Sequence, residues 1–320
     1  MATDFRLKNA LTKGTKLGRY LIECPIGGGG FSIVYKAIDR ENKNKVVIKE
    51  FMPMEKARRL EDQSIEYMSE DSEDSSPNSG IKRFFEEAGA LARFSHPAIV
   101  KVVDVFRANN TVYMVMHYHK GNDLRWYIKR HNGRLSEKFI RTVFPKVMEG
   151  LQAMHEKNML HLDIKPANIL IRPGGKPLLL DFGATKESLI SNRASGPHTL
   201  TMGFAPLEQH RHAHVGPWSD IYALGATMYA CVTGKAPPNA VEREQKDKLK
   251  PLRKTHGKQY SKAILETIDW CLQLDQLQRP QSIKELLEYM DRDWLEDEDV
   301  EQKGFLEYLQ DFGSILRKTR

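Results

Sequence analysis

The spacing of hydrophobic positions changes part-way along this chain. Residues 32–37 and 45–49 alternate apolar and polar positions or form β-branched runs, which is typical of strands. In most of the later chain, apolar residues recur at helical spacing instead. The pattern predicts further strands at 99–105 and 111–116, and helices at 81–94, 123–129, 136–155, 220–233, 261–274 and 282–291. A strand-rich part followed by a helix-rich part predicts an α+β fold of two lobes with a crevice between them.

Two segments differ from the rest in composition. Residues 61–80 hold seven carboxylates, no Lys or Arg, and a cluster of Ser, Pro and Asn. Such a segment buries too little apolar surface to order itself, so we expect a mobile acidic insertion in the first lobe. Residues 295–320 begin acidic and then place four apolar residues at helical spacing: Phe305, Leu309, Phe312 and Leu316. We expect this tail to form an amphipathic helix that packs on the body, binds a partner or joins two copies of the chain.

Composition narrows the class of protein. With 320 residues, 40% hydrophobic and 28% charged, the chain has the balance of a soluble globular protein. No apolar run reaches the roughly 18 residues of a membrane span, and the lead of residues 1–16 lacks a signal-peptide core. Three separated cysteines (Cys24, Cys231, Cys271) suit neither a disulfide framework nor a metal site, which favours a reducing, cytoplasmic setting. The net charge of +7 is not gathered into one patch with aromatics, so no nucleic-acid partner is expected.

Residues 161–168, with the sequence His-Leu-Asp-Ile-Lys-Pro-Ala-Asn, carry the strongest chemical signal. Asp163 can accept a proton from a hydroxyl, and Asn168 offers an oxygen ligand. Asp181-Phe182-Gly183 follows 13 positions after Asn168 and supplies a second oxygen ligand. Mg²⁺ prefers oxygen ligands and takes only one or two of them from protein when phosphates are also bound. The two motifs together therefore predict phosphoryl transfer, in which the protein chiefly positions reactants and neutralises charge.

With these two motifs the chain resembles the Hanks-type, eukaryotic-like serine/threonine protein kinases. The residues at 49–53 and 216–218 look most like bacterial members. The resemblance covers residues 17–294 and implies a bilobal fold, with a small antiparallel-sheet N-lobe at 17–118 and a mainly helical C-lobe at 119–294. It also implies transfer of the γ-phosphate of ATP to Ser or Thr hydroxyls of protein substrates, the kinase itself included. Mg²⁺ would be the metal, with Mn²⁺ as a substitute.

The resemblance assigns roles to the charged residues. Asp163 would orient the substrate hydroxyl and take its proton, while Lys165 would steady the transferred phosphate and Asn168 and Asp181 would hold the metal. Lys49 would contact the α- and β-phosphates and pair with a helix glutamate. Glu86 and Glu87 both offer themselves, and Glu87 is preferred because it lies ten residues before Pro97, as in the family.

A run of four glycines begins the nucleotide site. Glycines often mark only a flexible turn, but here Val34, Ala37 and Lys49 follow at the spacing of the kinase phosphate-covering loop, with Ser32 in place of its third glycine. Met116 would be the gatekeeper before the hinge, and Asp123 would reach the ribose. The residues expected around the nucleotide are Ile26, Gly27, Gly28, Gly29, Gly30, Phe31, Ser32, Val34, Val47, Lys49, Met116, Tyr118, Asp123 and Leu170.

Other residues match the scaffold of the family. Thr201 is placed to contact the catalytic loop, Asp220 to hold the backbone around His161, and Glu208 and Arg279 to form a buried ion pair. Leu162 departs from the family, which often has an Arg there that docks a phosphorylated activation segment. Since leucine cannot make that contact, we expect a non-RD kinase whose activity does not depend on it.

Two alternatives remain open. A pseudokinase that serves as a scaffold would typically lack one of four residues, all of which are present: Lys49, Asp163, Asn168 and Asp181. A small-molecule kinase of related fold is disfavoured, because Thr201 and Glu208 belong to the platform that binds peptide substrates. A metal site at His210, His212 and His214 is also disfavoured, because no further ligands cluster near them in the sequence.

Overall fold

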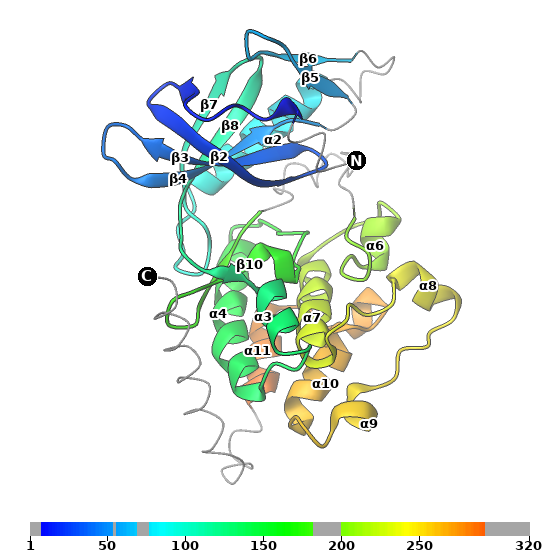
Figure 1. Ribbon diagram of the computed structural model, residues 1–320. Coiled ribbons are helices and arrows are strands. Elements are labelled where there is room, and N and C mark those ends of the chain that lie inside the picture. Colours follow the sequence, from blue (N-terminus) through cyan, green and yellow to red (C-terminus); the bar gives the residue numbers. More distant parts are fainter. Residues whose placement is uncertain (1–7, 54–55, 69–76, 182–199, 292–320) are drawn as a thin grey trace.

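The computed structural model describes residues 8–53, 56–68, 77–181 and 200–291 and shows two lobes (Figure 1). Strands and helix α2 (Pro77–Ala92) form most of the described upper lobe, and the described helices from α3 (Leu124–Arg130) to α11 (Ile283–Asp291) lie in the lower lobe. The expected helical tail lies outside the described residues, as do Phe182 and Gly183. No helix in the described part of the chain has the length and apolar character to cross a bilayer.

The upper lobe is built on an antiparallel sheet of six strands in the order β1-β2-β3-β4-β8-β7. Alternate side chains of β4 face opposite sides: Ile48 and Glu50 are buried in an outer core, whereas Val47 and Lys49 face the second lobe and the upper helix. The strands are β1 (Lys16–Leu17), β2 (Tyr20–Gly29), β3 (Ser32–Asp39), β4 (Lys45–Phe51), β7 (Val102–Ala108) and β8 (Thr111–His117). The period of two therefore sends Lys49 into the cleft and Glu50 away from it.

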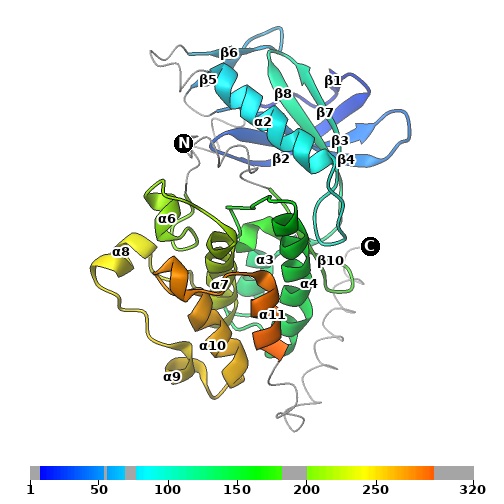
Figure 2. The same ribbon diagram turned by 180° about the vertical axis from the view of Figure 1, so that it is seen from behind.

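Helix α2 (Pro77–Ala92) packs on one face of this sheet, against β7 and β8 (Figure 2). The other face is covered by Leu11 and by a hairpin of β5 (Ala57–Arg59) and β6 (Ile65–Tyr67). The prediction that residues 61–80 as a whole fail to order was therefore wrong. Ile65 is 1% exposed and its amide donates to the Asn109 carbonyl, and Tyr67 packs on the same core. Two apolar side chains thus hold this strand on the sheet within a polar segment.

The lower lobe contains all the helices predicted beyond residue 120, each within a few residues of its expected bounds. Side chains cap three of them: Asp123 caps α3, Ser136 caps α4 and Ser261 caps α10. The helices are α3 (Leu124–Arg130), α4 (Glu137–Glu156), α6 (Leu207–His210), α7 (Pro217–Thr233), α8 (Ala240–Gln245), α9 (Leu252–His256), α10 (Lys262–Cys271) and α11 (Ile283–Asp291), with 3₁₀ turns η2 (Pro166–Asn168) and η3 (Gln276–Gln278). The short α8 and α9 were not predicted, since one or two turns show no periodicity.

A small sheet joins the lobes next to the catalytic loop. It has the order β11-β10-β9, formed by β9 (Asn122–Asp123), β10 (Ile169–Arg172) and β11 (Lys176–Leu179). The Leu179 amide donates to the Ala98 carbonyl at 2.7 Å, and the Val100 amide donates to the Leu179 carbonyl at 3.0 Å. These bonds tie the segment after α2 to the strand that leads to Asp181, so they fix one lobe against the other at the site.

Candidate active site

The catalytic loop is held from below by a buried carboxylate. Asp220, in α7, has no exposed surface and accepts hydrogen bonds from the amides of His161 at 2.9 Å and Leu162 at 2.7 Å. Burial opposes its ionisation, but the hydrogen bond from His155 and these amides hold the pKa of Asp220 below its ordinary value. Leu162 has a φ of 58°, a left-handed conformation that leucine rarely adopts. The predicted role of Asp220 is confirmed, and its two bonds hold this strained turn.

The side chain of Asp163 is the centre of a hydrogen-bonded cluster. Lys165 Nζ lies 2.8 Å from Asp163 Oδ1 and 2.7 Å from Oδ2. Thr201 Oγ1 accepts from Lys165 Nζ at 2.9 Å and donates to Asp163 Oδ1 at 3.2 Å. Asn168 Nδ2 donates to Asp163 Oδ2 at 2.9 Å. The predicted contact of Thr201 with the catalytic loop is confirmed, and four residues from two distant segments meet at one carboxylate.

Replacing Thr201 with Val removes the hydroxyl that joins Lys165 and Asp163 while keeping the side-chain volume. We expect kcat for phosphotransfer to fall by about 10- to 100-fold, because a misaligned acceptor group loses much of its catalytic value. The KM for ATP should change little. Steady-state kinetics separate the two constants, and Thr142→Val is the control because Thr142 is exposed and bonds only within α4. A Thr201→Val enzyme with normal kcat would contradict this role.

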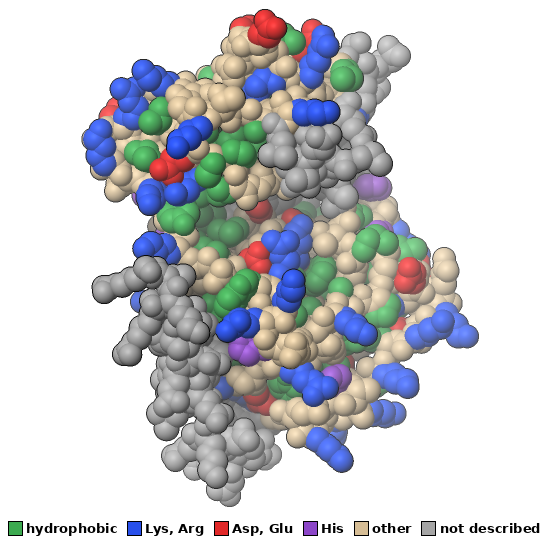
Figure 3. Space-filling view, in the orientation of Figure 1, with side chains coloured by type: hydrophobic (Ala, Val, Ile, Leu, Met, Phe, Trp, Pro, Cys, Tyr) green, Lys and Arg blue, Asp and Glu red, His purple; other side chains and the backbone are tan. Residues whose placement is uncertain are grey.

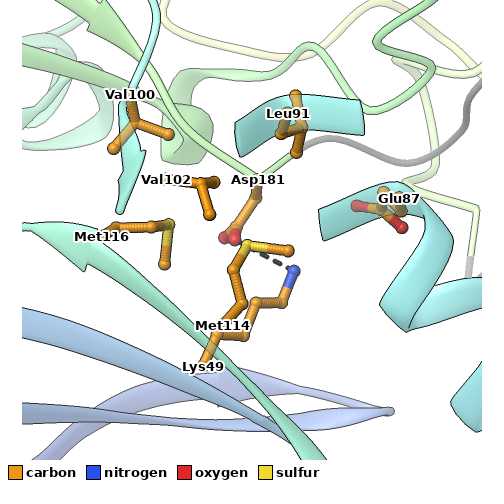
Figure 4. A pocket seen from close by; sticks show the side chains of 8 residues that line it. All are labelled: Lys49, Glu87, Leu91, Val100, Val102, Met114, Met116 and Asp181. Atoms are coloured by element: carbon orange, nitrogen blue, oxygen red, sulfur yellow. Dashed lines mark ion pairs between the residues drawn. The ribbon is translucent and has the colours of Figure 1, made fainter. Parts of the chain in front are cut away.

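Lys49 pairs with Asp181 rather than with a glutamate. Its Nζ lies 3.1 Å from Asp181 Oδ1, and among the described residues no ion pair joins Lys49 to Glu87 (Figure 4). The expected Lys49–Glu87 pair is therefore not formed in this structure. Burial works against the charge of Lys49, but the carboxylates of Asp181 and Glu87 raise its pKa. The charge of Lys49 in turn lowers the pKa of Asp181, so both groups are ionised at neutral pH.

Glu87 lies close to the Lys49–Asp181 pair, and its pKa is shifted by its surroundings. Burial raises its pKa to about 7, since Lys49 only partly offsets the loss of solvent and Asp181 adds a like charge. Its side chain lines a narrow recess behind Lys49, together with apolar residues of α2 and of the strands (Figure 4). The recess is lined by Lys49, Glu87, Leu91, Val100, Val102, Met114, Met116 and Asp181. Met116, the predicted gatekeeper, therefore stands at its wall.

The glycine run forms the hairpin between β2 and β3, as predicted. Gly28 has a φ of +149°, and a Cβ there would lie 2.3 Å from the Ser32 carbonyl oxygen, so only glycine fits. The Phe31 carbonyl at the tip accepts a 2.8 Å hydrogen bond from the Met52 amide. Ser32 is 7% exposed, which agrees with a small residue in place of a glycine. The hairpin is thus anchored to the chain just after Lys49.

Predicted adenine contacts come from both lobes. Val34 lies opposite Lys49 across β3 and β4, and Val47 lies opposite Met116 across β4 and β8. Leu170 lies on β10 in the lower lobe, where β10 pairs with β9. All three valine and leucine side chains are partly buried. Their strands place them at the cleft, and the contact with a purine remains a prediction.

Asp123 and Tyr118, both expected at the nucleotide, make hydrogen bonds within the protein. Asp123 caps α3 through the Trp126 amide at 3.0 Å and binds Arg125 at 2.6 Å. The Tyr118 amide donates to the Lys45 carbonyl at 3.4 Å. His119 follows Tyr118 directly and is not among the residues predicted at the nucleotide; its amide has no hydrogen-bond acceptor among the residues that the structure describes.

Asn168 and Asp181 are suited to hold a divalent cation. The amide nitrogen of Asn168 donates to both the backbone and the side chain of Asp163, each at 2.9 Å, which leaves the Oδ1 oxygen for a ligand. Asp181 is held ionised by Lys49. Carboxylate and amide oxygens are the ligands of hard cations such as Mg²⁺. In the space-filling view the cleft between the lobes gathers acidic and basic side chains beside hydrophobic ones (Figure 3).

The lower lobe contains the predicted buried ion pair of Glu208 and Arg279. Arg279 Nη1 lies 2.7 Å from Glu208 Oε1 and Nη2 lies 3.1 Å from Oε2, and the side chain of Arg279 has no exposed surface. The Ser219 hydroxyl donates to Glu208 at 2.8 Å. The prediction of this pair is confirmed. It anchors the segment that follows Thr201 to the body of the lower lobe.

Comparison with known proteins agrees with this geometry. A family profile described as "protein kinase domain" matches residues 20–295. The chain belongs to the protein kinase family. This kinase is 32% identical over 226 residues to serine/threonine-protein kinase PknK of Mycobacterium tuberculosis, covering 70% of this chain and 18% of that protein. It is also 32% identical over 221 residues to serine/threonine-protein kinase PrkC of Bacillus subtilis, covering 69% of this chain and 31% of that protein.

Solved structures support the same family. The kinase is 35% identical to "PpkA-294 apo form", with a TM-score of 0.78 and coverage of 88% of this chain and 100% of that chain. Rad53 residues 1–466 in complex with AMP-PNP shows the same fold at 21% identity, with a TM-score of 0.64, covering 87% of this chain and 65% of that one. The kinase spans less than a third of the length of PknK and PrkC. The predicted bilobal kinase fold and the likeness to bacterial serine/threonine kinases are confirmed.

Proposed function

We propose that this kinase transfers the γ-phosphate of ATP to Ser or Thr hydroxyls of protein substrates. The observation that carries the proposal is the convergence of Asp163, Lys165 and Thr201 at one carboxylate, with the Lys49–Asp181 ion pair at the same cleft. The first supplies a proton acceptor with its positioning groups. The second supplies positive and negative charge for phosphates and metal. A pseudokinase is disfavoured because the described residues lack none of these parts.

Each side chain has a place in the reaction. A substrate hydroxyl within hydrogen-bond reach of Asp163 would give up its proton to that carboxylate while its oxygen attacks the γ-phosphorus and the bond to the β-phosphate oxygen breaks. Lys165, already hydrogen-bonded to Asp163, would neutralise charge on the transferred group. Lys49 would hold the α- and β-phosphates. Asn168 and Asp181 would hold Mg²⁺ or Mn²⁺, which when bound neutralises phosphate charge.

Leu162 supports a further part of the proposal. Its carbonyl accepts from Gln209 Nε2 at 2.9 Å and its amide donates to Asp220, so the loop is held by uncharged and carboxylate partners within the fold. A leucine has no cation to bind a phosphorylated activation segment. We infer that the kinase is non-RD and retains activity when fully dephosphorylated, although it phosphorylates itself among its substrates. Phosphatase-treated protein that is inert, and that a phosphomimetic change in residues 191–199 revives, would contradict this.

The test is a transfer assay on the whole chain. Purified kinase, γ-labelled ATP and a generic acceptor protein are mixed with Mg²⁺, and the labelled amino acids are identified after hydrolysis. We expect label on Ser or Thr, and at least about 10³-fold less label when EDTA removes the metal, since the phosphates then lose their counter-charge. Either Mg²⁺ or Mn²⁺ should restore transfer. Label confined to a small molecule, or transfer indifferent to EDTA, would contradict the proposal.

A further inference from the structure

Most of α2 packs on β7 and β8, but one of its sides also meets side chains of β4, the strand that carries Lys49. Gly80, Phe84, Glu87 and Leu91 are spaced by four, three and four residues, so they share one side of the helix. Phe84 is 8% exposed, and Glu87 and Leu91 line the recess with Lys49. The distance between α2 and β4 therefore determines where the Glu87 carboxyl group lies relative to Lys49.

Phe51 stands between the start of α2 and the sheet. It lies two residues after Lys49 on the same face of β4, and its ring centroid is 5.7 Å from that of Phe84. A Cβ built on Gly80 would lie 2.7 Å from Cζ of the Phe51 ring. Carbon atoms in good contact are about 3.5 Å apart or more, so a side chain at position 80 would displace the ring or the helix by roughly 0.8 Å.

Helix formation does not explain a glycine at this place. Only proline is a poorer helix former in a helix interior than glycine. Gly89 shows the contrast: it lies in the same helix, and a Cβ there would meet nothing within 4 Å. Of these two glycines, only Gly80 lies where a side chain would meet the Phe51 ring.

We propose that Gly80 and Phe51 are positioning residues, and that the Phe51 ring packed on the side-chain-free turn at Gly80 sets how closely α2 approaches Lys49. This inference rests on the proposed function, because it concerns the groups that would hold ATP. The Phe84 ring, which packs on Phe51, also lies 5.9 Å from Lys49 Nζ. The contact therefore reaches the nucleotide-binding lysine by way of a single side chain.

The helix carries a displacement from one end to the other. Glu87 follows Gly80 by seven residues, which is about two turns or roughly 10 Å of helix. Because α2 is a continuous helix, a shift of its first turns also moves Glu87. Misplacement by about 1 Å can cost on the order of 100-fold in rate even when it arises away from the reacting atoms.

A mutant cycle tests the contact. Gly80→Ala should lower kcat/KM for phosphotransfer by about 10- to 100-fold. Phe51→Leu, which removes the ring atoms near Gly80 but leaves a large apolar side chain there, should lower kcat/KM by about three- to fivefold, less than Gly80→Ala does. The double variant should recover to within about threefold of Phe51→Leu, since coupled residues are not additive. Gly89→Ala is the matched control and should stay within about twofold of wild type.

The activities of these variants show whether the Phe51–Gly80 contact positions α2. Gly80→Ala with the activity of Gly89→Ala would overturn it, and so would a loss that Phe51→Leu fails to rescue. Melting temperatures of the same four variants provide a readout that needs no catalysis: Gly80→Ala should lower the melting temperature, and Phe51→Leu should remove most of that difference. If the wild type transfers no phosphate, the proposed function fails, and the contact is then judged by the melting temperatures alone.

Discussion

Asp163→Asn is expected to lower phosphotransfer by about 10³-fold while nucleotide affinity stays near that of wild type. The amide cannot accept the hydroxyl proton, and general-base catalysis contributes on the order of 10²- to 10⁴-fold. The neighbours of Asp163 also lose their charge partner: Lys165 lies within 2.8 Å of its carboxylate and Asn168 donates to it at 2.9 Å. The measurement is the initial rate of label transfer from ATP, with affinity for an ATP analogue measured by titration.

Asp62→Asn is the matched control for this prediction. Asp62 is an exposed carboxylate in the β5–β6 turn, where it accepts hydrogen bonds from Ser64. The control should transfer phosphate at the wild-type rate. If Asp163→Asn were as active as Asp62→Asn, the assignment of the proton acceptor would be wrong. If it lost nucleotide binding as well, its effect would be structural rather than catalytic.

Arg279→Leu is expected to lower the free energy of unfolding by roughly 3–5 kcal/mol, because it leaves the buried Glu208 carboxylate without its cation. Glu208 is 6% exposed. Arg279 also donates to the carbonyl groups of Gln273 and Leu274 at 2.7 and 2.9 Å, and its guanidinium lies 4.8 Å from the Tyr222 ring centroid. For a domain of this size the loss corresponds to a melting temperature lower by roughly 10 °C. Thermal and urea unfolding measure it.

Two further variants separate the buried pair from surface pairs. Arg253→Leu removes an arginine that is 60% exposed and pairs with Glu266 at 3.1 Å, so it should cost less than about 1 kcal/mol. Adding Glu208→Leu to Arg279→Leu should restore part of the stability, since no unpaired charge then remains buried. Equal losses from Arg279→Leu and Arg253→Leu would show that the Glu208–Arg279 pair does not anchor this segment.

The contacts of residues that belong to a family motif were predictable from the sequence. Thr201, Asp220 and the Glu208–Arg279 pair all lie where the resemblance placed them, because each makes a contact that the fold itself requires. The two-lobed arrangement followed from a change in hydrophobic period, which records burial directly.

Residues whose partners depend on tertiary packing were not predictable. Lys49 was expected to meet Glu87, but its partner here is Asp181, and the choice depends on how closely α2 packs on the sheet. Asp123 was expected at the ribose, which stays a prediction; that it also caps α3 was not predicted, although a nearby backbone donor makes such a cap common for Asp. The β5–β6 hairpin was not predicted because few apolar residues, Ile65 and Tyr67 among them, lie in an otherwise polar segment. In each case the contact depends on the three-dimensional packing, which the order of residues along the chain does not reveal.

We expect residues from both lobes to meet around one nucleotide and its metal. A crystal structure of the whole chain with a non-hydrolysable ATP analogue and Mg²⁺ tests it most directly. We expect Lys49 on the α- and β-phosphates, Asn168 and Asp181 on the metal, and the γ-phosphate next to Lys165 and Asp163. A nucleotide bound elsewhere, or a metal held without Asn168 and Asp181, would contradict the account.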